Sequence, residues 1–343
     1  MPDIYSPLDI RGFHFPNRIV VAPMVRFGFP SEKGVMGQRL IDDHLMRSGC
    51  GAGLVVSEAT YVADDVPLPS EISWRPGAYS DDHIPHLSRL CESYHRGGSV
   101  FFAQLAHPGF AYYDPECRDI SRVALDEIEK IRDGFIRSAL RCSRAGLDGV
   151  ELHGAHSFFL NSLASATANH RDDRYGGDLT GRLNLAREII EGIKSFSGDR
   201  FLVSYRMGWT ESSDNDAKTA QALEGMGLDL IHVSSGIPDK RPDLAGLLPG
   251  FNEVVAAGAQ IKKHVTIPLI CVNRIDTIAR GSTLIEEGHA DFAAYGRPFL
   301  ADTHFARNAL DNPDYAPCRN CSRCQWFTDG SRCPAQIQLG QVH

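Results

Sequence analysis

The 343-residue chain lacks the features that mark membrane, secreted and nucleic-acid-binding proteins. It has no apolar run of about 18 residues, so we expect no membrane-spanning helix. The N-terminal segment MPDIYSPLDIRGF has no basic stretch followed by an apolar one and does not resemble a signal peptide. A formal charge of −8 and a pI near 5.9 argue against a nucleic acid or an acidic membrane as partner. Five of the nine cysteines are scattered singly along the chain, which predicts a protein of the reducing cytoplasm.

The chain also lacks linkers, low-complexity segments and any G-x-G-x-x-G pattern after an apolar run. A doubly wound dinucleotide-binding sheet is therefore disfavoured. What the chain does contain is a series of short, β-branched apolar runs, which are typical of parallel strands covered on both faces. The eight runs are 18–24, 52–60, 99–107, 148–154, 200–207, 229–235, 267–273 and 291–296.

Amphipathic helical patterns separate these runs. Ile128, Ile131 and Phe135, for example, recur on one helical face, and similar patterns cover 84–94 and 183–193. Eight strands that alternate with helices predict an α/β fold, a (β/α)₈ TIM barrel, over residues 1–303. Residues 304–343 form a cysteine-rich tail.

In such a barrel the chemistry lies at the C-terminal ends of the strands. These ends carry amide, imidazole and guanidinium groups but few carboxylates. Gly296 and Arg297 follow the last strand, where barrels build phosphate sites from backbone N–H groups. Arg206 offers a fixed positive charge that suits an anionic ring system such as reduced flavin.

Several segments resemble the Old Yellow Enzyme family of FMN-dependent oxidoreductases, in the same order, over residues 5–303. The segment from Asn169 to Gly177, N-x-R-x-D-x-Y-G-G, is the most specific. The matching segments are PNRIVVAPM, FFAQLAHPG, ELHGAHSFFLNSLASATANHRDDRYGGDLTGR, VSYRM, IHVSSG and AYGRPFLAD.

This resemblance implies that FMN lies across the strand ends. It implies that Gln104 hydrogen-bonds the pyrimidine edge, that Arg206 faces the N1/O2 side and stabilises the reduced anion, and that Arg297 holds the phosphate. The cofactor-binding residues expected in this way are Pro23, Met24, Ala59, Gln104, Arg206, Asn273, Gly296 and Arg297.

His153 and His156 follow the fourth predicted strand, three positions apart. By the same resemblance, they are the catalytic pair that hydrogen-bonds a carbonyl or similar group above the flavin. Donors aimed at an oxygen that gains charge during hydride transfer stabilise the transition state. The alternative is a pair of buried histidines with a structural role.

Three places depart from the family pattern, and one of them is the turn of Asn273 and Arg274, where relatives commonly have glycine and where side chains would then supply the phosphate contacts. Phe158 stands where many ene-reductases carry a tyrosine that donates a proton, and a phenyl ring cannot do so. Tyr112 and Tyr113 are either substitutes or ordinary loop aromatics. Val25 stands where relatives often have threonine or cysteine near the flavin.

The tail contains Cys318, Cys321, Cys324 and Cys333 in a C-x₂-C-x₂-C-x₈-C arrangement. Sites of four cysteines hold either a [4Fe–4S] cluster or zinc. The tail resembles that of the 2,4-dienoyl-CoA reductase and trimethylamine dehydrogenase branch, and this resemblance implies a [4Fe–4S] cluster. Zinc and unfilled thiols are the alternatives.

Together these features predict an FMN-dependent oxidoreductase that moves hydride between flavin and a small substrate. Reduction of an activated C=C bond in an enone, enoate or enoyl-CoA is the leading hypothesis. An oxidative amine dehydrogenase or demethylase, and a non-catalytic flavin-binding subunit, are the alternatives. The electron donor is either NAD(P)H or an external redox partner protein, and assembly into a homo-oligomer stays open.

Overall fold

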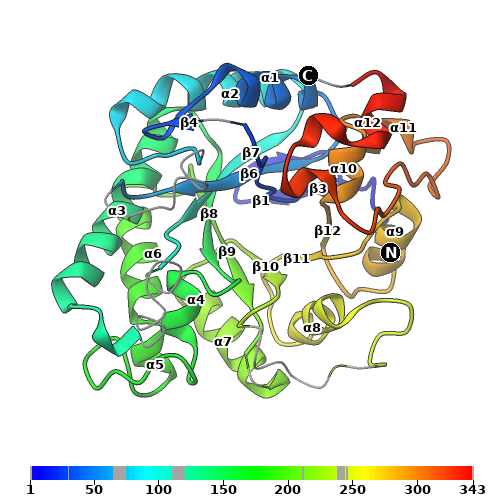
Figure 1. Cartoon of the computed structure of the whole chain (residues 1–343). Coiled ribbons are helices and arrows are strands. Elements are labelled where there is room, and N and C mark those ends of the chain that lie inside the picture. The colour runs from blue at the N-terminus through cyan, green and yellow to red at the C-terminus, as the bar shows by residue number, and fades with distance from the viewer. Residues whose placement is uncertain are drawn as a thin grey trace.

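The computed structural model describes residues 2–29, 31–64, 75–109, 120–210, 212–237, 244 and 246–341. Its centre is a closed barrel of eight parallel strands (Figure 1). This arrangement confirms the predicted (β/α)₈ barrel and all eight predicted strands. The strands are β3 (Ile19–Val21), β6 (Leu54–Tyr61), β7 (Val100–Ala106), β8 (Gly149–Gly154), β9 (Leu202–Gly208), β10 (Leu230–Ser234), β11 (Leu269–Val272) and β12 (Phe292–Tyr295).

Helices follow the strands and cover the outside of the barrel (Figure 1). The longer helices are α1 (Gln38–Arg47), α2 (Ile84–Arg96), α3 (Leu125–Arg144), α6 (Asn184–Ser197), α7 (Ser213–Gly225), α8 (Glu253–Lys262) and α9 (Ile278–Glu286). The shorter ones are α4 (Phe159–Ala164), α5 (Leu179–Arg182), α10 (Arg297–Ala301), α11 (Phe305–Asn308) and α12 (Pro334–Leu339). In the described part of the chain, no helix has both the length and the apolar character to cross a membrane.

An N-terminal hairpin closes one end of the barrel. Strands β1 (Leu8–Ile10) and β2 (Phe13–Phe15) pair antiparallel, and Ile10 and Phe15 join the apolar core of the barrel interior. The Phe15 ring lies 5.4 Å from that of Phe292, the first residue of β12. The hairpin therefore fills the N-terminal end of the barrel, which leaves the C-terminal ends of the strands for a site.

The C-terminal tail packs against the segment that leads from β3 to α1, as Figure 1 shows. This segment includes the small hairpin of β4 (Ser31–Glu32) and β5 (Val35–Met36). The Trp326 ring lies 6.0 Å from that of Phe29, and Arg39 donates a 3.0 Å hydrogen bond to Asp329. Trp326 and Cys333 are buried in the same core cluster as the barrel and its helices. The tail is thus part of the packed structure.

Candidate active site

Strand register brings several predicted residues to the same end of the barrel. Ala59 on β6 pairs with Gln104 on β7, and His153 on β8 pairs with Arg206 on β9. Successive side chains of a strand alternate between its two faces. All four residues are buried near the C-terminal ends of their strands. The structure therefore places the amide, one imidazole and one guanidinium on neighbouring strands.

The two histidines contact each other directly. Their ring centroids lie 5.1 Å apart, and Nδ1 of His156 is 3.3 Å from Nε2 of His153. Nε2 of His156 is 2.7 Å from the Ser234 hydroxyl oxygen, which also accepts a 3.2 Å hydrogen bond from Arg206. His156 and Ser157 have φ angles of 58° and 62°. Non-glycine residues are uncommon in this left-handed region, and strained positions of this kind cluster at functional sites.

Burial keeps both imidazoles neutral near pH 7. It lowers the pKa of His153 well below its ordinary value, and electrostatic interactions with His156 and Arg206 lower it further. It lowers the pKa of His156 to about 3. A neutral imidazole has one N–H donor and one acceptor nitrogen. Nδ1 of His153 is buried without a hydrogen-bond partner in the described structure.

Phe158 forms an apolar wall beside these imidazoles. Its ring centroid lies 4.3 Å from that of His153, in an edge-on arrangement. It packs in a small cluster with Ala59, Tyr61 and Ala106, and Val25 lies against this cluster. Phe158 and Val25, which both depart from the family pattern, thus belong to one apolar region. The candidate proton donors Tyr112 and Tyr113 lie outside the described residues.

A cavity of about 730 Å³ adjoins the ends of β11 and β12. Asn273, Gly296 and Arg297, which we expect to bind FMN, line it together with Arg274 and Arg323. Asn273 and Arg274 have φ angles of 100° and 51°, so side-chain-bearing residues hold a turn that favours glycine. Three guanidinium groups around one cavity suit a phosphate.

Pro23 and Met24 follow β3 and are half-buried. A Cβ atom at Gly296 would lie 3.3 Å from the Met24 sulfur atom, so this glycine keeps the two segments close. Met24 therefore lies beside the residues that line the cavity.

All four tail cysteines line a second, smaller cavity, which also contacts Arg297. Cys333 is buried, Cys318 and Cys324 are half-buried, and Cys321 is exposed. Cys321 and Cys324 line the larger cavity as well. No three His, Cys, Asp or Glu side chains of the described residues are arranged to hold a metal ion.

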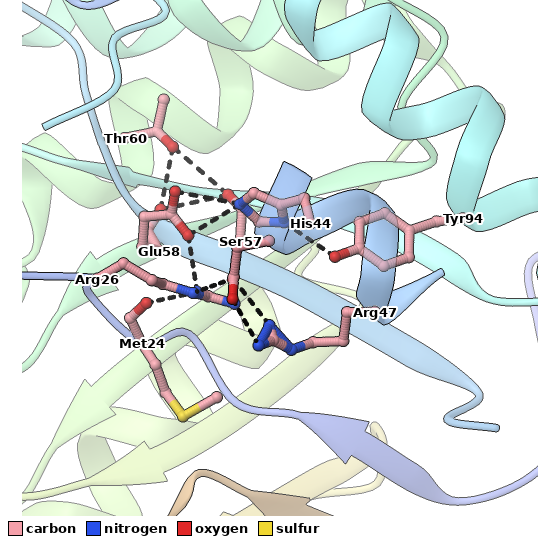
Figure 2. A network of polar contacts seen from close by, with 9 residues as sticks. Met24, Arg26, His44, Arg47, Ser57, Glu58, Thr60 and Tyr94 are labelled. Atoms are coloured by element: carbon pink, nitrogen blue, oxygen red, sulfur yellow. Dashed lines mark hydrogen bonds and ion pairs between the residues drawn. The ribbon is translucent and has the colours of Figure 1, made fainter. Parts of the chain in front are cut away.

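A buried ionic network contacts the backbone of Met24 (Figure 2), and sequence patterns did not reveal it. The Arg26 guanidinium donates hydrogen bonds to Glu58 at 2.8 Å, to Asp43 at 3.0 Å and to the Met24 carbonyl oxygen at 2.5 Å. Nε2 of His44 lies 3.1 Å from Glu58. This network therefore holds the backbone of the segment that contacts Gly296.

Two more side chains, Arg47 and Tyr94, belong to this network. Arg47 donates two hydrogen bonds to Asp43, and Nδ1 of His44 lies 2.9 Å from the Tyr94 hydroxyl (Figure 2). Burial alone would raise the pKa of Glu58, but His44 and Arg26 lower it to about 2. Glu58 therefore stays ionised at neutral pH.

A second buried carboxylate, Glu151, lies inside the barrel. It accepts hydrogen bonds from Gln104 and His232, both at 2.8 Å. One sequence signal could have identified it: Glu151 stands two positions before His153 on a strand, so the two side chains share a face.

Comparisons with known proteins agree with this geometry. A family model described as the NADH:flavin oxidoreductase / NADH oxidase family matches residues 3–313. An NADH oxidase of Thermoanaerobacter brockii is 30% identical, with 98% of this chain but 55% of that protein covered, so the chain spans about half its length. An NADPH dehydrogenase of Bacillus pumilus is 27% identical, with 90% and 94% covered.

Among solved structures, the old yellow enzyme homologue from Zymomonas mobilis has the same fold. Its TM-score is 0.75 at 21% sequence identity, with 96% of this chain and 97% of that chain covered.

Proposed function

The chain belongs to the NADH:flavin oxidoreductase / NADH oxidase family, whose members are FMN-dependent oxidoreductases, and from this premise we propose that it reduces an activated C=C bond of a small substrate. Enones, enoates and enoyl-CoA thioesters are the substrate class, and NAD(P)H is the electron donor. The observation that carries the proposal is the neutral pair of His153 and His156 next to Arg206 at the barrel end, with His156 held at a positive φ angle.

The residues at this end fit FMN. Nε of Arg206, Nδ1 of His153 and Nε2 of His232 are buried without hydrogen-bond partners in the described structure. Buried polar atoms usually have partners, so these three suit a ligand that is rich in nitrogen and oxygen. Arg297 and its neighbours would hold the phosphate. When bound, FMN supplies the hydride-transfer chemistry.

The chain's own residues would orient and polarise the substrate. Nδ1 of His153 is the ring nitrogen that can donate a hydrogen bond to a carbonyl oxygen, because it has no partner in the described structure. Both ring nitrogens of His156 already contact His153 and the Ser234 hydroxyl, so His156 would orient His153. Such donation favours addition at the neighbouring alkene carbon, since the oxygen gains negative charge. The Ser234 hydroxyl contacts His156 and Arg206 and keeps both in place. Phe158 has no acidic hydrogen, so the second carbon receives its proton from another group or from solvent.

An anaerobic substrate screen tests this proposal. Protein reconstituted with FMN is reduced with NADH or NADPH and then mixed with enones, enoyl-CoAs or methylated amines while flavin absorbance is recorded. Reoxidation by an enone or enoyl-CoA is the expected result. Bleaching of oxidised flavin by an amine would contradict it and favour an oxidative dehydrogenase. Inertness toward every compound would favour a flavin-binding subunit.

We also propose that Cys318, Cys321, Cys324 and Cys333 hold a [4Fe–4S] cluster. Their spacing and their shared cavity support this, and a cluster would pass single electrons between the flavin and an external partner. Iron and sulfide analysis of anaerobically prepared protein should find about four of each per chain. Cys333→Ser should lose iron, whereas Cys271→Ser, a buried cysteine on β11, should keep it. One zinc and no iron would contradict the cluster.

A further inference from the structure

Glu151 is fully buried inside the barrel and makes three polar contacts. One carboxylate oxygen, Oε1, accepts a 2.8 Å hydrogen bond from Nε2 of Gln104. The other, Oε2, lies 2.8 Å from Nδ1 of His232 and 3.4 Å from the Ser204 hydroxyl. The carboxylate therefore connects β7, β8, β9 and β10 beneath the layer that contains His153 and Arg206.

The ionisation of Glu151 decides how the Gln104 amide is oriented. Burial by itself would raise the pKa of Glu151, but the interactions with His232, Arg206 and Gln104 lower it below the ordinary value. An ionised carboxylate can only accept hydrogen bonds. Gln104 must therefore turn its NH₂ group toward Glu151, which directs its Oε1 atom elsewhere. No described residue hydrogen-bonds this oxygen.

We propose that Glu151 is a positioning residue that fixes the Gln104 amide so that Gln104 Oε1 accepts the N3–H hydrogen of the flavin. This inference rests on the proposed binding of FMN. The pyrimidine edge of a flavin presents one donor, N3–H, between two carbonyl acceptors. A Gln104 amide whose oxygen faces the flavin complements the N3–H donor, and its second N–H hydrogen would be available to a flavin carbonyl.

The other contacts of Glu151 determine what a substitution would do. His232 is neutral, because burial lowers its pKa, and its Nδ1–H donates to Oε2 of Glu151. In Glu151→Gln, the new amide oxygen would take this position, since His232 and Ser204 both donate there. The new NH₂ group would then face Gln104, and the Gln104 amide would have to reverse. Its NH₂ group would meet the N3–H hydrogen of the flavin, donor against donor.

Reconstitution with two flavins measures this orientation. Apoprotein is titrated with FMN and with 3-methyl-FMN, which has no N3–H, and the ratio of the dissociation constants is determined by fluorescence quenching. The wild-type protein should bind 3-methyl-FMN roughly 5- to 150-fold more weakly, the range for a buried acceptor left unpaired. In Glu151→Gln this ratio should fall by about tenfold or more. Gln104→Ala should also lose the discrimination.

Two variants serve as controls. Glu58→Gln removes an equally buried carboxylate that does not contact Gln104, so the ratio should stay at the wild-type value. Glu151→Asp keeps an acceptor that cannot donate, so the preference for FMN should be retained. The ratio is the informative quantity, because a merely structural Glu151 would weaken the binding of both flavins alike.

A folded Glu151→Gln variant with the wild-type ratio would overturn the proposal. If this variant does not fold, Glu151→Met is used instead, since replacing a buried ionic group by an apolar one of similar volume is often tolerated. It too should lose the discrimination, and the wild-type ratio in it would overturn the proposal. A wild-type protein that binds both flavins equally would also refute it. Failure of the wild-type apoprotein to bind any FMN would instead refute the proposed function, and the positioning role with it.

Discussion

Replacing Glu58 by glutamine should make the free energy of unfolding less sensitive to acid. Glu58 is 2% exposed and lies within hydrogen-bond distance of Arg26 and His44. These neighbours hold its pKa at about 2, compared with an ordinary value of 4.5. The folded state therefore binds this proton less readily than the unfolded state does.

The sign and the size of the effect follow from this difference. A depressed carboxyl pKa contributes stability that is fully present above pH 4.5 and is lost as the pH falls toward 2. At about 1.4 kcal/mol per pKa unit, the whole contribution is about 3 kcal/mol. About 2 kcal/mol of it should be lost by pH 3. The stability advantage of the wild-type protein over Glu58→Gln should shrink by this amount between about pH 6 and pH 3.

Urea unfolding of the apoprotein at several pH values, followed by tryptophan fluorescence, measures this difference. Glu191→Gln is the matched control, because Glu191 forms an ion pair with Arg187 that is largely exposed. Such a pair contributes little to stability, so the free energy of unfolding of the control should change with pH as that of the wild type does. If the free energy of unfolding of Glu58→Gln also changes as that of the wild type does between pH 6 and pH 3, the neighbours do not hold the buried carboxylate ionised and the reasoning is wrong.

Three other predictions concern the flavin and the substrate. Arg297→Ala should lose FMN on gel filtration more readily than Arg206→Ala, because a charge-assisted phosphate contact contributes about 1.5–3 kcal/mol; equal retention would contradict this assignment. His153→Ala or His156→Ala should lower turnover of a carbonyl-activated alkene by roughly 10²–10³ with flavin content intact, and near-wild-type turnover would make the pair structural. Phe158→Tyr should retain activity, and it should raise ene-reduction if protonation limits the rate; a solvent isotope effect near unity, unchanged in the variant, would show that it does not.

The barrel could be predicted from the sequence because its strands are buried on both faces. Six of the eight strands lie within a predicted apolar run, β6 and β9 extend one residue beyond theirs, and β6 is buried along its whole length. Hydrophobic periodicity reports burial directly, so it located the helices between the strands as well. The ends of the predicted strands then placed His153, Arg206 and Gly296 at one end of the barrel, and the resemblance implied their roles. The family assignment is confirmed by the match over residues 3–313.

The polar networks were decided only by the tertiary structure. Arg26 reaches Glu58 across 32 positions of the chain, and Glu151 reaches His232 across 81. Local sequence patterns record which face of an element is buried, but not which distant charge will be buried beside it. Because an unpaired buried charge is strongly destabilising, each of these carboxylates depends on a partner that only the closed barrel supplies. The sequence by itself determined the elements and their order, and barrel closure determined which side chains meet within it.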